Sequence, residues 1–234
     1  MKESGIMGKA FGTVMFLIAG VCLCVLFLVV YPGGDLCRLF QYALVLLCFL
    51  HTFLHRSQSF EGLLCLLAML FTVLADFFLV ALREAQWLLG LGVFCLAQLC
   101  WAVRLLLMER GKRRLVHLMA WAGVCGTLLI VAVILARGGD TLLLMGAVYA
   151  SLLLTTVLFA WAGARNFLFT LGMTLFLGCD FFVMVNNAAL YLDLAQHPLL
   201  SALHAIPFNM MWAFYGPSQM LLALSSARRT KPVR

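Results

Sequence analysis

The sequence predicts an all-α protein that crosses a membrane many times, and its composition is the first reason. Of its 234 residues, 65% are hydrophobic and only 11% are charged, and the mean hydropathy is +1.08. The second reason is the length of the apolar stretches, because a helix needs about 20 apolar residues to cross a bilayer. A soluble fold is therefore excluded. We expect one polytopic helical bundle, a single membrane domain over residues 1–234.

Eight apolar stretches are long enough to span a bilayer, and the connections between them are short. The predicted transmembrane helices are 10–30, 36–54, 62–82, 87–107, 115–136, 141–162, 166–186 and 199–224. The first leads directly into another span and lacks a cleavage site, so we interpret it as a transmembrane helix rather than a signal peptide. The last contains Pro207 and Pro217, which should bend it and free backbone groups that protein or water must cover.

The net charge of +7 is a topology signal. In an eight-span arrangement most basic residues fall on the side that holds both termini, which the positive-inside rule assigns to the cytoplasm. They are Lys2, Lys9, Arg56, Arg110, Lys112, Arg113, Arg114, Arg165, Arg228, Arg229, Lys231 and Arg234. We expect a basic cytoplasmic tail at 225–234, a location in the cell (plasma) membrane, and contact with anionic lipid headgroups rather than nucleic acid. Arg104, near the basic end of the fourth span, is expected to extend to those headgroups.

No metal and no cofactor are predicted. The nine cysteines contain no Cys-x-x-Cys pair, and the five histidines are scattered without ligand spacing. The cysteines lie in or beside the spans, and we interpret them as small apolar packing residues.

Three short motifs recur at nearly one spacing, which indicates an internal duplication. The pairs are Ala19-Gly-Val-Cys22 with Ala122-Gly-Val-Cys125, Gly33-Gly-Asp35 with Gly138-Gly-Asp140, and Asp76-Phe-Phe78 with Asp180-Phe-Phe182. Each half then contains four spans, an even number, so the halves form two parallel four-helix repeats, residues 10–107 and 115–224. We expect Asp76 and Asp180 to face each other across the axis that relates the repeats.

Asp76 and Asp180 are the candidate catalytic residues, because a carboxyl inside a membrane span is costly and usually faces a protein interior or a wet cavity. Each lies six residues before the outer end of its span, about 9 Å deep. Arg83 and Asn187 follow them by seven residues on the same helix face, and His204 enters from the outer side at a similar depth. The alternative is that the carboxyls only hold helices together through hydrogen bonds.

The fourth and eighth spans carry further polar residues. Gly90 and Gly92 are expected to allow close helix approach, and Gln98 lies near the midplane. Gln98 and Gln219 remain open to two interpretations, as functional groups or as ordinary interhelical hydrogen-bonding residues.

These motifs resemble the YhhN-like family of membrane proteins, whose characterised members are lysoplasmalogenases. The resemblance rests on four motifs: Ala75-Asp76; Gly90-Leu-Gly-Val-Phe94 leading to Gln98 and Trp101; Phe176-Leu-Gly-Cys-Asp180; and Phe214-Tyr-Gly-Pro-Ser-Gln219 with the following Met-Leu-Leu-Ala-Leu-Ser225. The chain departs from the family pattern at four positions, where Ala75 replaces Gly, Gln98 replaces His, Trp101 replaces Tyr and Cys179 replaces Ser. An amide does not titrate, so Gln98 cannot carry a proton as a histidine would.

The resemblance implies hydrolysis of the vinyl ether of a lysoplasmalogen, which yields a fatty aldehyde and a glycerophospho-alcohol. Such a reaction needs an acid, a base and stabilisation of a cation, and two carboxyls with different environments can divide these roles. The expected substrate is a single-chain lysophospholipid taken from the bilayer. Residues expected to contact it are Arg83, Gln98, Asn187, His204, Tyr215 and Gln219.

Two other functions stay open. Parallel repeats, a proline-containing helix and intramembrane acids also occur in small transporters, although both carboxyls here lie toward one face. A non-catalytic lipid-binding protein is the other alternative, since Gln98 stands where the family has a histidine.

Overall fold

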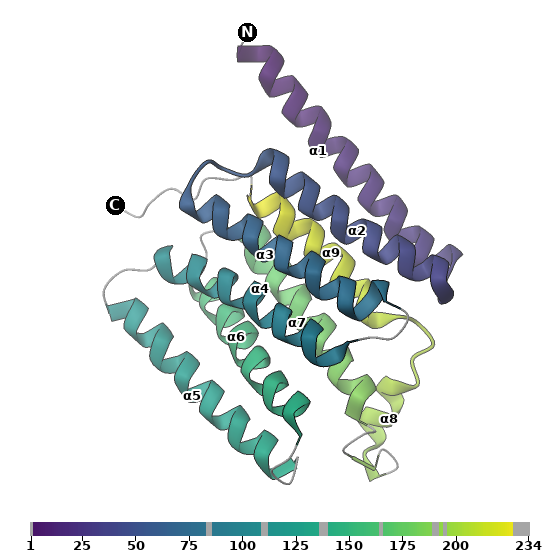
Figure 1. The fold of residues 1–234 in the computed structure, drawn as a ribbon, viewed down its shortest axis with the longest axis vertical. Helices are drawn as coiled ribbons and strands as arrows, with labels where there is room; N and C mark the ends of the chain where they lie inside the picture. The colour runs from purple at the N-terminus through teal and green to yellow at the C-terminus, as the bar shows by residue number, and fades with distance from the viewer. Residues whose placement is uncertain are drawn as a thin grey trace.

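A computed structural model describes residues 2–82, 86–108, 112–135, 140–163, 166–188, 192–193 and 196–226, with side chains from residue 10 onward. These residues form an all-helical bundle (Figure 1). The α-helices are α1 (Lys2–Val25), α2 (Gly34–His55), α3 (Phe60–Asp76), α4 (Trp87–Met108), α5 (Lys112–Leu135), α6 (Thr141–Gly163), α7 (Phe167–Asn187), α8 (Pro198–His204) and α9 (Met210–Ser226). Two π-helical segments, η1 (Leu26–Val30) and η2 (Phe77–Ala81), extend α1 and α3.

Polar residues between the apolar stretches define where several helices begin. The Ser59 hydroxyl accepts a hydrogen bond from the Gly62 N–H, and the Asn166 side chain accepts one from the Phe169 N–H. Asp140 caps α6 by accepting from the N–H groups of Leu142 and Leu143. Each side chain satisfies N–H groups that the first turn of a helix leaves free.

Within the described part of the chain, seven helices are long and apolar enough to cross a membrane, which identifies an integral membrane protein. They are Ala10–Val30, Gly34–His55, Phe60–Ala81, Trp87–Leu107, Lys112–Ile134, Thr141–Gly163 and Phe167–Asn187. These match the first seven predicted spans.

The eighth predicted span differs from the expected single bent helix. The chain is broken between α8, which ends at His204, and α9, which begins at Met210 and has 17 residues. Pro207 lies in the break, where a residue without an N–H and with a fixed φ ends a helix more readily than it bends one. Asn209 then caps α9, because its side chain accepts from the Trp212 N–H. Pro217 does lie inside a helix, as predicted.

The helices pack in recurring pairs (Figure 1). α1 packs on α2 and α5 on α6; α3 packs on α4 and α7 on α9; α4 packs on α6 and α2 on α9. α1 and α5 lie at the two edges of the bundle, so the protein core is formed chiefly by the six long helices between them.

Glycines bring α9 close to its neighbours. A Cβ on Gly178 of α7 would lie 2.7 Å from Phe214 Cδ1, and one on Gly216 of α9 would lie 3.1 Å from Cys24 Sγ. The Ser218 hydroxyl donates a 2.8 Å hydrogen bond to the Gly172 carbonyl on α7. Small residues at these positions let the backbones approach, and they hold the inner face of α9 in one position.

Only one of the two glycines in α4 is used in this way. A Cβ on Gly90 would overlap the Leu79 side chain of η2, whereas one on Gly92 would meet Met145 Sδ at an ordinary 3.7 Å. The expectation of close approach is therefore wrong for Gly92.

Candidate functional site

Asp76 is the last residue of α3, and its carboxyl is buried in the bundle. Only 3% of the residue is exposed, and the Tyr215 hydroxyl of α9 donates a 2.6 Å hydrogen bond to Oδ2. Immediately after Asp76 the helix changes from α to π. π-helical turns are rare and often occur at functional sites. The bond to Tyr215 joins the first half of the chain to the second.

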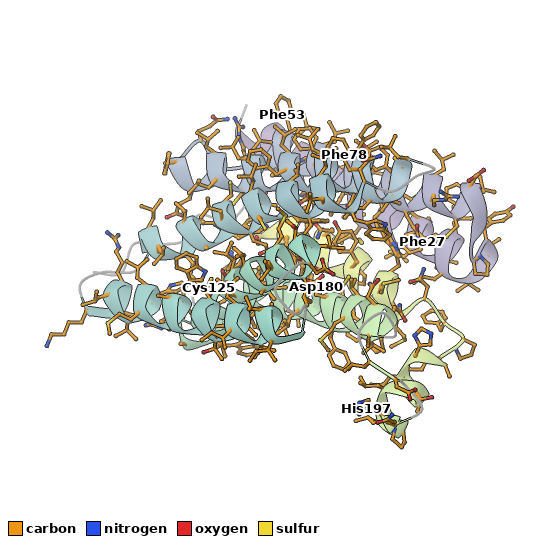
Figure 2. The ribbon with its side chains drawn as sticks, turned by 60° about the horizontal axis from the view of Figure 1, so that its bottom comes forward. Phe27, Phe53, Phe78, Cys125, Asp180 and His197 are labelled. Atoms are coloured by element: carbon orange, nitrogen blue, oxygen red, sulfur yellow. The ribbon has the colours of Figure 1, made fainter. Side chains whose placement is uncertain are left out.

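Asp180 lies in the middle of α7 and accepts a hydrogen bond from a different tyrosine. The Tyr149 hydroxyl of α6 donates to Asp180 Oδ2 at 2.6 Å. Asp180 as a whole residue is half-buried, so it is less enclosed by protein than Asp76. Figure 2 shows Asp180 near the middle of the bundle, among side chains from several helices.

Tyr149 was not among the sequence candidates, although the recurrence of Asp-Phe-Phe offers a signal for it. Tyr42 precedes Asp76 by 34 residues and Tyr149 precedes Asp180 by 31, each on the helix before the carboxyl. Tyr42 also interacts electrostatically with Asp76. A search for polar residues before both motifs would have found Tyr149.

Aromatic contacts join the two Asp–Tyr pairs, Asp76–Tyr215 and Asp180–Tyr149, which we call the carboxyl cluster. The Phe94 ring of α4 makes edge contacts with Tyr149 and Tyr215, with centroids 6.1 Å and 6.4 Å away. The Cys179 thiol interacts electrostatically with both carboxyls. The two acids therefore share one site, built from α3, α4, α6, α7 and α9.

The two glutamines lie deep in the bundle. Gln98 and Gln219 have no exposed surface, and neither amide has a hydrogen-bond partner among the described residues. The Gln98 amide lies beside the Tyr149 hydroxyl without forming a hydrogen bond of good geometry. Gln98 follows Phe94 by four residues, and Gln219 follows Tyr215 by four, so each amide lies one turn beyond the carboxyl cluster.

The predicted polar residues on the outer side do not join the carboxyl cluster. Asn187 is exposed, and its amide donates to the Val183 carbonyl of its own helix at 2.8 Å. His204 is exposed on α8, and Figure 2 shows neighbouring His197 at the edge of the molecule, far from Asp180. Arg83 lies outside the described residues.

The position of Arg104 is the clearest disagreement with the sequence prediction. It does not extend to the headgroups, since only 2% of the residue is exposed. Its guanidinium lies over the rings of Phe169 and Trp101, at 4.9 Å and 5.8 Å from the centroids. Helical side chains point back toward the helix N-terminus, and this one lies over Trp101, three residues earlier on the buried face of α4.

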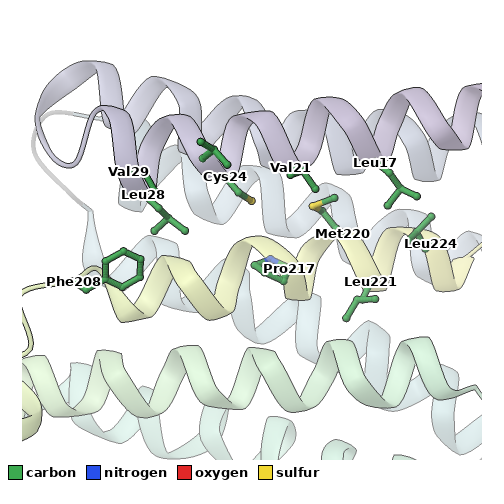
Figure 3. Close-up of a pocket in the computed structure, with 11 residues that line it drawn as sticks. Leu17, Val21, Cys24, Leu28, Val29, Phe208, Pro217, Met220, Leu221 and Leu224 are labelled. Atoms are coloured by element: carbon green, nitrogen blue, oxygen red, sulfur yellow. The ribbon is translucent and has the colours of Figure 1, made fainter.

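An apolar groove lies between α1, η1 and α9 (Figure 3). It has a volume of about 380 Å³, and its lining includes Leu28, Phe208, Pro217 and Met220 but neither carboxyl of the cluster. Within the described residues, no three His, Cys, Asp or Glu side chains are grouped closely enough to hold a metal ion.

Comparison with known proteins identifies a family. No curated protein and no solved structure matches the chain. The family model of the YhhN family matches residues 36–226, a range that contains every member of the carboxyl cluster and both buried glutamines. The chain therefore belongs to the YhhN family.

Proposed function

We propose that this protein is a lysoplasmalogenase-like hydrolase that cleaves the vinyl ether of a lysoplasmalogen. Family membership supports the proposal. The observation that carries it is the carboxyl cluster, in which two intramembrane acids each accept a tyrosine hydrogen bond and share one aromatic neighbour. A reaction that needs an acid, a base and a stabilised cation uses such a pair.

The chemistry divides between the two acids according to their exposure. In our proposal the half-buried Asp180 meets the substrate and donates a proton to the vinyl carbon remote from the oxygen. The resulting cation is shared by the other vinyl carbon and the ether oxygen, and the Asp76 carboxyl, held in place by Tyr215, stabilises it.

Water then adds to the carbon beside the oxygen, and its released proton returns to Asp180. The hemiacetal so formed breaks into a fatty aldehyde and a glycerophospho-alcohol. Asp180 regains its proton in this sequence, so no other reactant is consumed besides lipid and water.

Gln98 fits this scheme without titrating. Its oxygen can accept from the attacking water and its nitrogen can donate to an ether oxygen, and both atoms lack protein partners among the described residues. We propose that Gln98 orients the water or the ether beside Tyr149, with Tyr215 and Gln219 bordering the same space.

For the topology we propose eight transmembrane helices arranged as two parallel four-helix repeats, with both termini in the cytoplasm of a plasma-membrane protein. The recurring packing pairs support the repeats, since α1–α2, α3–α4 and α4–α6 correspond to α5–α6, α7–α9 and α9–α2. In this arrangement α9 is the eighth span, about 25 Å long at 1.5 Å per residue, and α8 lies at its outer end.

The test is release of fatty aldehyde by purified protein in detergent. Lysoplasmalogen should be cleaved, the ester-linked lysolipid of the same chain length should not, and Asp180→Asn should slow the reaction by roughly 10²–10⁴-fold. Folded protein that binds lysoplasmalogen without releasing aldehyde would contradict the proposal and favour a lipid-binding role instead.

A further inference from the structure

The interior of the bundle contains an unusual concentration of unsatisfied hydrogen-bonding groups. Among the described residues, nine buried side-chain atoms lack a partner, and seven of them belong to Gln98, Trp101, Arg104 and Gln219, which we call the donor strip. Five of these seven atoms are nitrogens and two are amide oxygens. Buried polar groups normally have hydrogen-bond partners. The excess of donors in this strip therefore suits water or a ligand that carries several acceptor oxygens.

Arg104 supplies the charge of the donor strip. Its Nε and Nη1 atoms have no partner among the described residues, and only aromatic rings cover the guanidinium. A buried cation normally has a counter-ion. The described carboxylate related to it is Glu61, since both groups act electrostatically on the Cys65 thiol, but Glu61 makes no hydrogen bond to Nε or Nη1.

The Arg104 end of the donor strip lies farther along α4 from the carboxyl cluster than Gln98 does. Phe94 contacts both tyrosines, and seven residues separate it from Trp101, against which the guanidinium lies. Seven residues of helix rise about 10 Å. Five bonds join the sn-1 ether oxygen of a lysophospholipid to its phosphorus, and together they span roughly 6 Å. A hydrogen bond at each end of this segment adds about 3 Å.

We propose that Arg104 binds the phosphate of the lipid substrate, with the headgroup directed toward the cytoplasmic end of α4 while the vinyl ether lies at the carboxyl cluster. The lipid part of this inference rests on the proposed function, whereas the phosphate part does not. The recognised chemistry is a phosphate ester, free or as a lipid headgroup. Arg104 is then the specificity determinant for phospholipids over neutral glycerol ethers.

The experiment measures binding of ligands that cannot be hydrolysed. These are a 1-alkyl lysophospholipid, the 1-alkylglycerol of the same chain length without phosphate, and glycerol 3-phosphate, each titrated against tryptophan fluorescence in detergent. The variants are Arg104→Gln and Arg104→Lys. Arg56→Gln is the matched control, because Arg56 also lies over a phenylalanine ring but at the end of α2.

Arg104→Gln should weaken binding of the alkyl lysophospholipid at least tenfold and leave the affinity for the alkylglycerol unchanged. Arg104→Lys should give an intermediate loss. Arg56→Gln should change the affinity for neither lipid. Glycerol 3-phosphate binding that Arg104→Gln abolishes would assign the site to phosphate esters in general, whereas binding of the lipid alone would assign it to the headgroup of a membrane lipid. Equal loss for both lipids in Arg104→Gln, or no loss for either, would overturn the inference.

Further measurements distinguish a role of Arg104 in binding from a role in folding or in catalysis. Removal of an unpaired buried cation should not lower the thermal unfolding midpoint of the ligand-free protein, so a lowered midpoint in both Arg104 variants would mark a structural role and overturn the inference. Wild-type protein that binds phospholipid through Arg104 without cleaving lysoplasmalogen would refute the proposed reaction only. Cleavage with an unchanged KM in Arg104→Gln would refute this inference only.

Discussion

Asp76 and Asp180 begin the same three-residue motif but occupy different surroundings. Asp76 ends an α-helix, precedes a π-helical segment and is almost fully buried against a tyrosine from the other half of the chain. Asp180 lies within a continuous helix, is half-buried and bonds a tyrosine from the adjacent helix.

This difference teaches that a duplicated motif does not produce two equivalent sites. The helices around the two carboxyls differ in sequence and packing, and the tyrosines come from α9 for Asp76 and from α6 for Asp180. We infer that Asp180 is the acid that meets the substrate and that Asp76 is the carboxyl that stabilises the cation behind it. Changes made in matched pairs, one on each side, test that distinction.

The largest expected effect is on turnover. Asp180→Asn should lower kcat/KM for lysoplasmalogen by roughly 10²–10⁴-fold, the usual contribution of a general acid or base. Asp76→Asn should lose less, because the amide preserves the shape of the site while it removes the charge. Steady-state aldehyde release checks both variants, and a greater loss in Asp76→Asn would reverse the assignment.

The next effect is on stability. Tyr215→Phe leaves the deeply buried Asp76 carboxyl without its donor and should destabilise the fold by about 1–3 kcal/mol, whereas Tyr149→Phe should cost about 0.5–1.5 kcal/mol because Asp180 is more accessible. Unfolding in mixed detergent micelles measures both. Tyr31→Phe is the control, since Tyr31 is 45% exposed. A larger loss in Tyr149→Phe would contradict the difference in burial.

A smaller effect is expected at the glutamines. Gln98→Leu removes the amide beside Tyr149 and should lower kcat/KM about tenfold, equivalent to roughly 1.4 kcal/mol, the scale of one hydrogen bond. Gln219→Leu, one turn beyond Tyr215 on the Asp76 side, should lower it less. Aldehyde release with both variants measures the ratio, and equal losses would mean that the two sides contribute alike.

The smallest effect concerns the packing of the π-helical segment after Asp76. Gly90→Ala places a methyl group against Leu79 and should destabilise by about 1 kcal/mol. Gly92→Ala has room for the methyl group and should be neutral or slightly stabilising, because alanine favours helix over glycine. Thermal unfolding compares the two, and equal midpoints would show that η2 yields to the added group.

Prediction from sequence succeeded for features that a single segment of the chain specifies. The seven confirmed spans follow from apolar length, and the family follows from short motifs around Asp76 and Asp180. Prediction failed where two segments had to meet. Asn187 was placed near the carboxyls by its spacing on the helix and His204 by its depth, and neither says which neighbouring helix a side chain meets.

Sequence by itself determined the membrane class, the first seven spans, the family and the presence of two intramembrane acids, because a bilayer requires long apolar helices and makes each buried charge conspicuous. Tertiary structure alone decided that Tyr149 and Tyr215 are the partners of those acids, that Arg104 turns inward, and that the last apolar stretch breaks at Pro207. These outcomes depend on which helix faces pack together and on where the chain can leave a helix. Hydrophobicity, which is high in every one of these spans, carries little of that information.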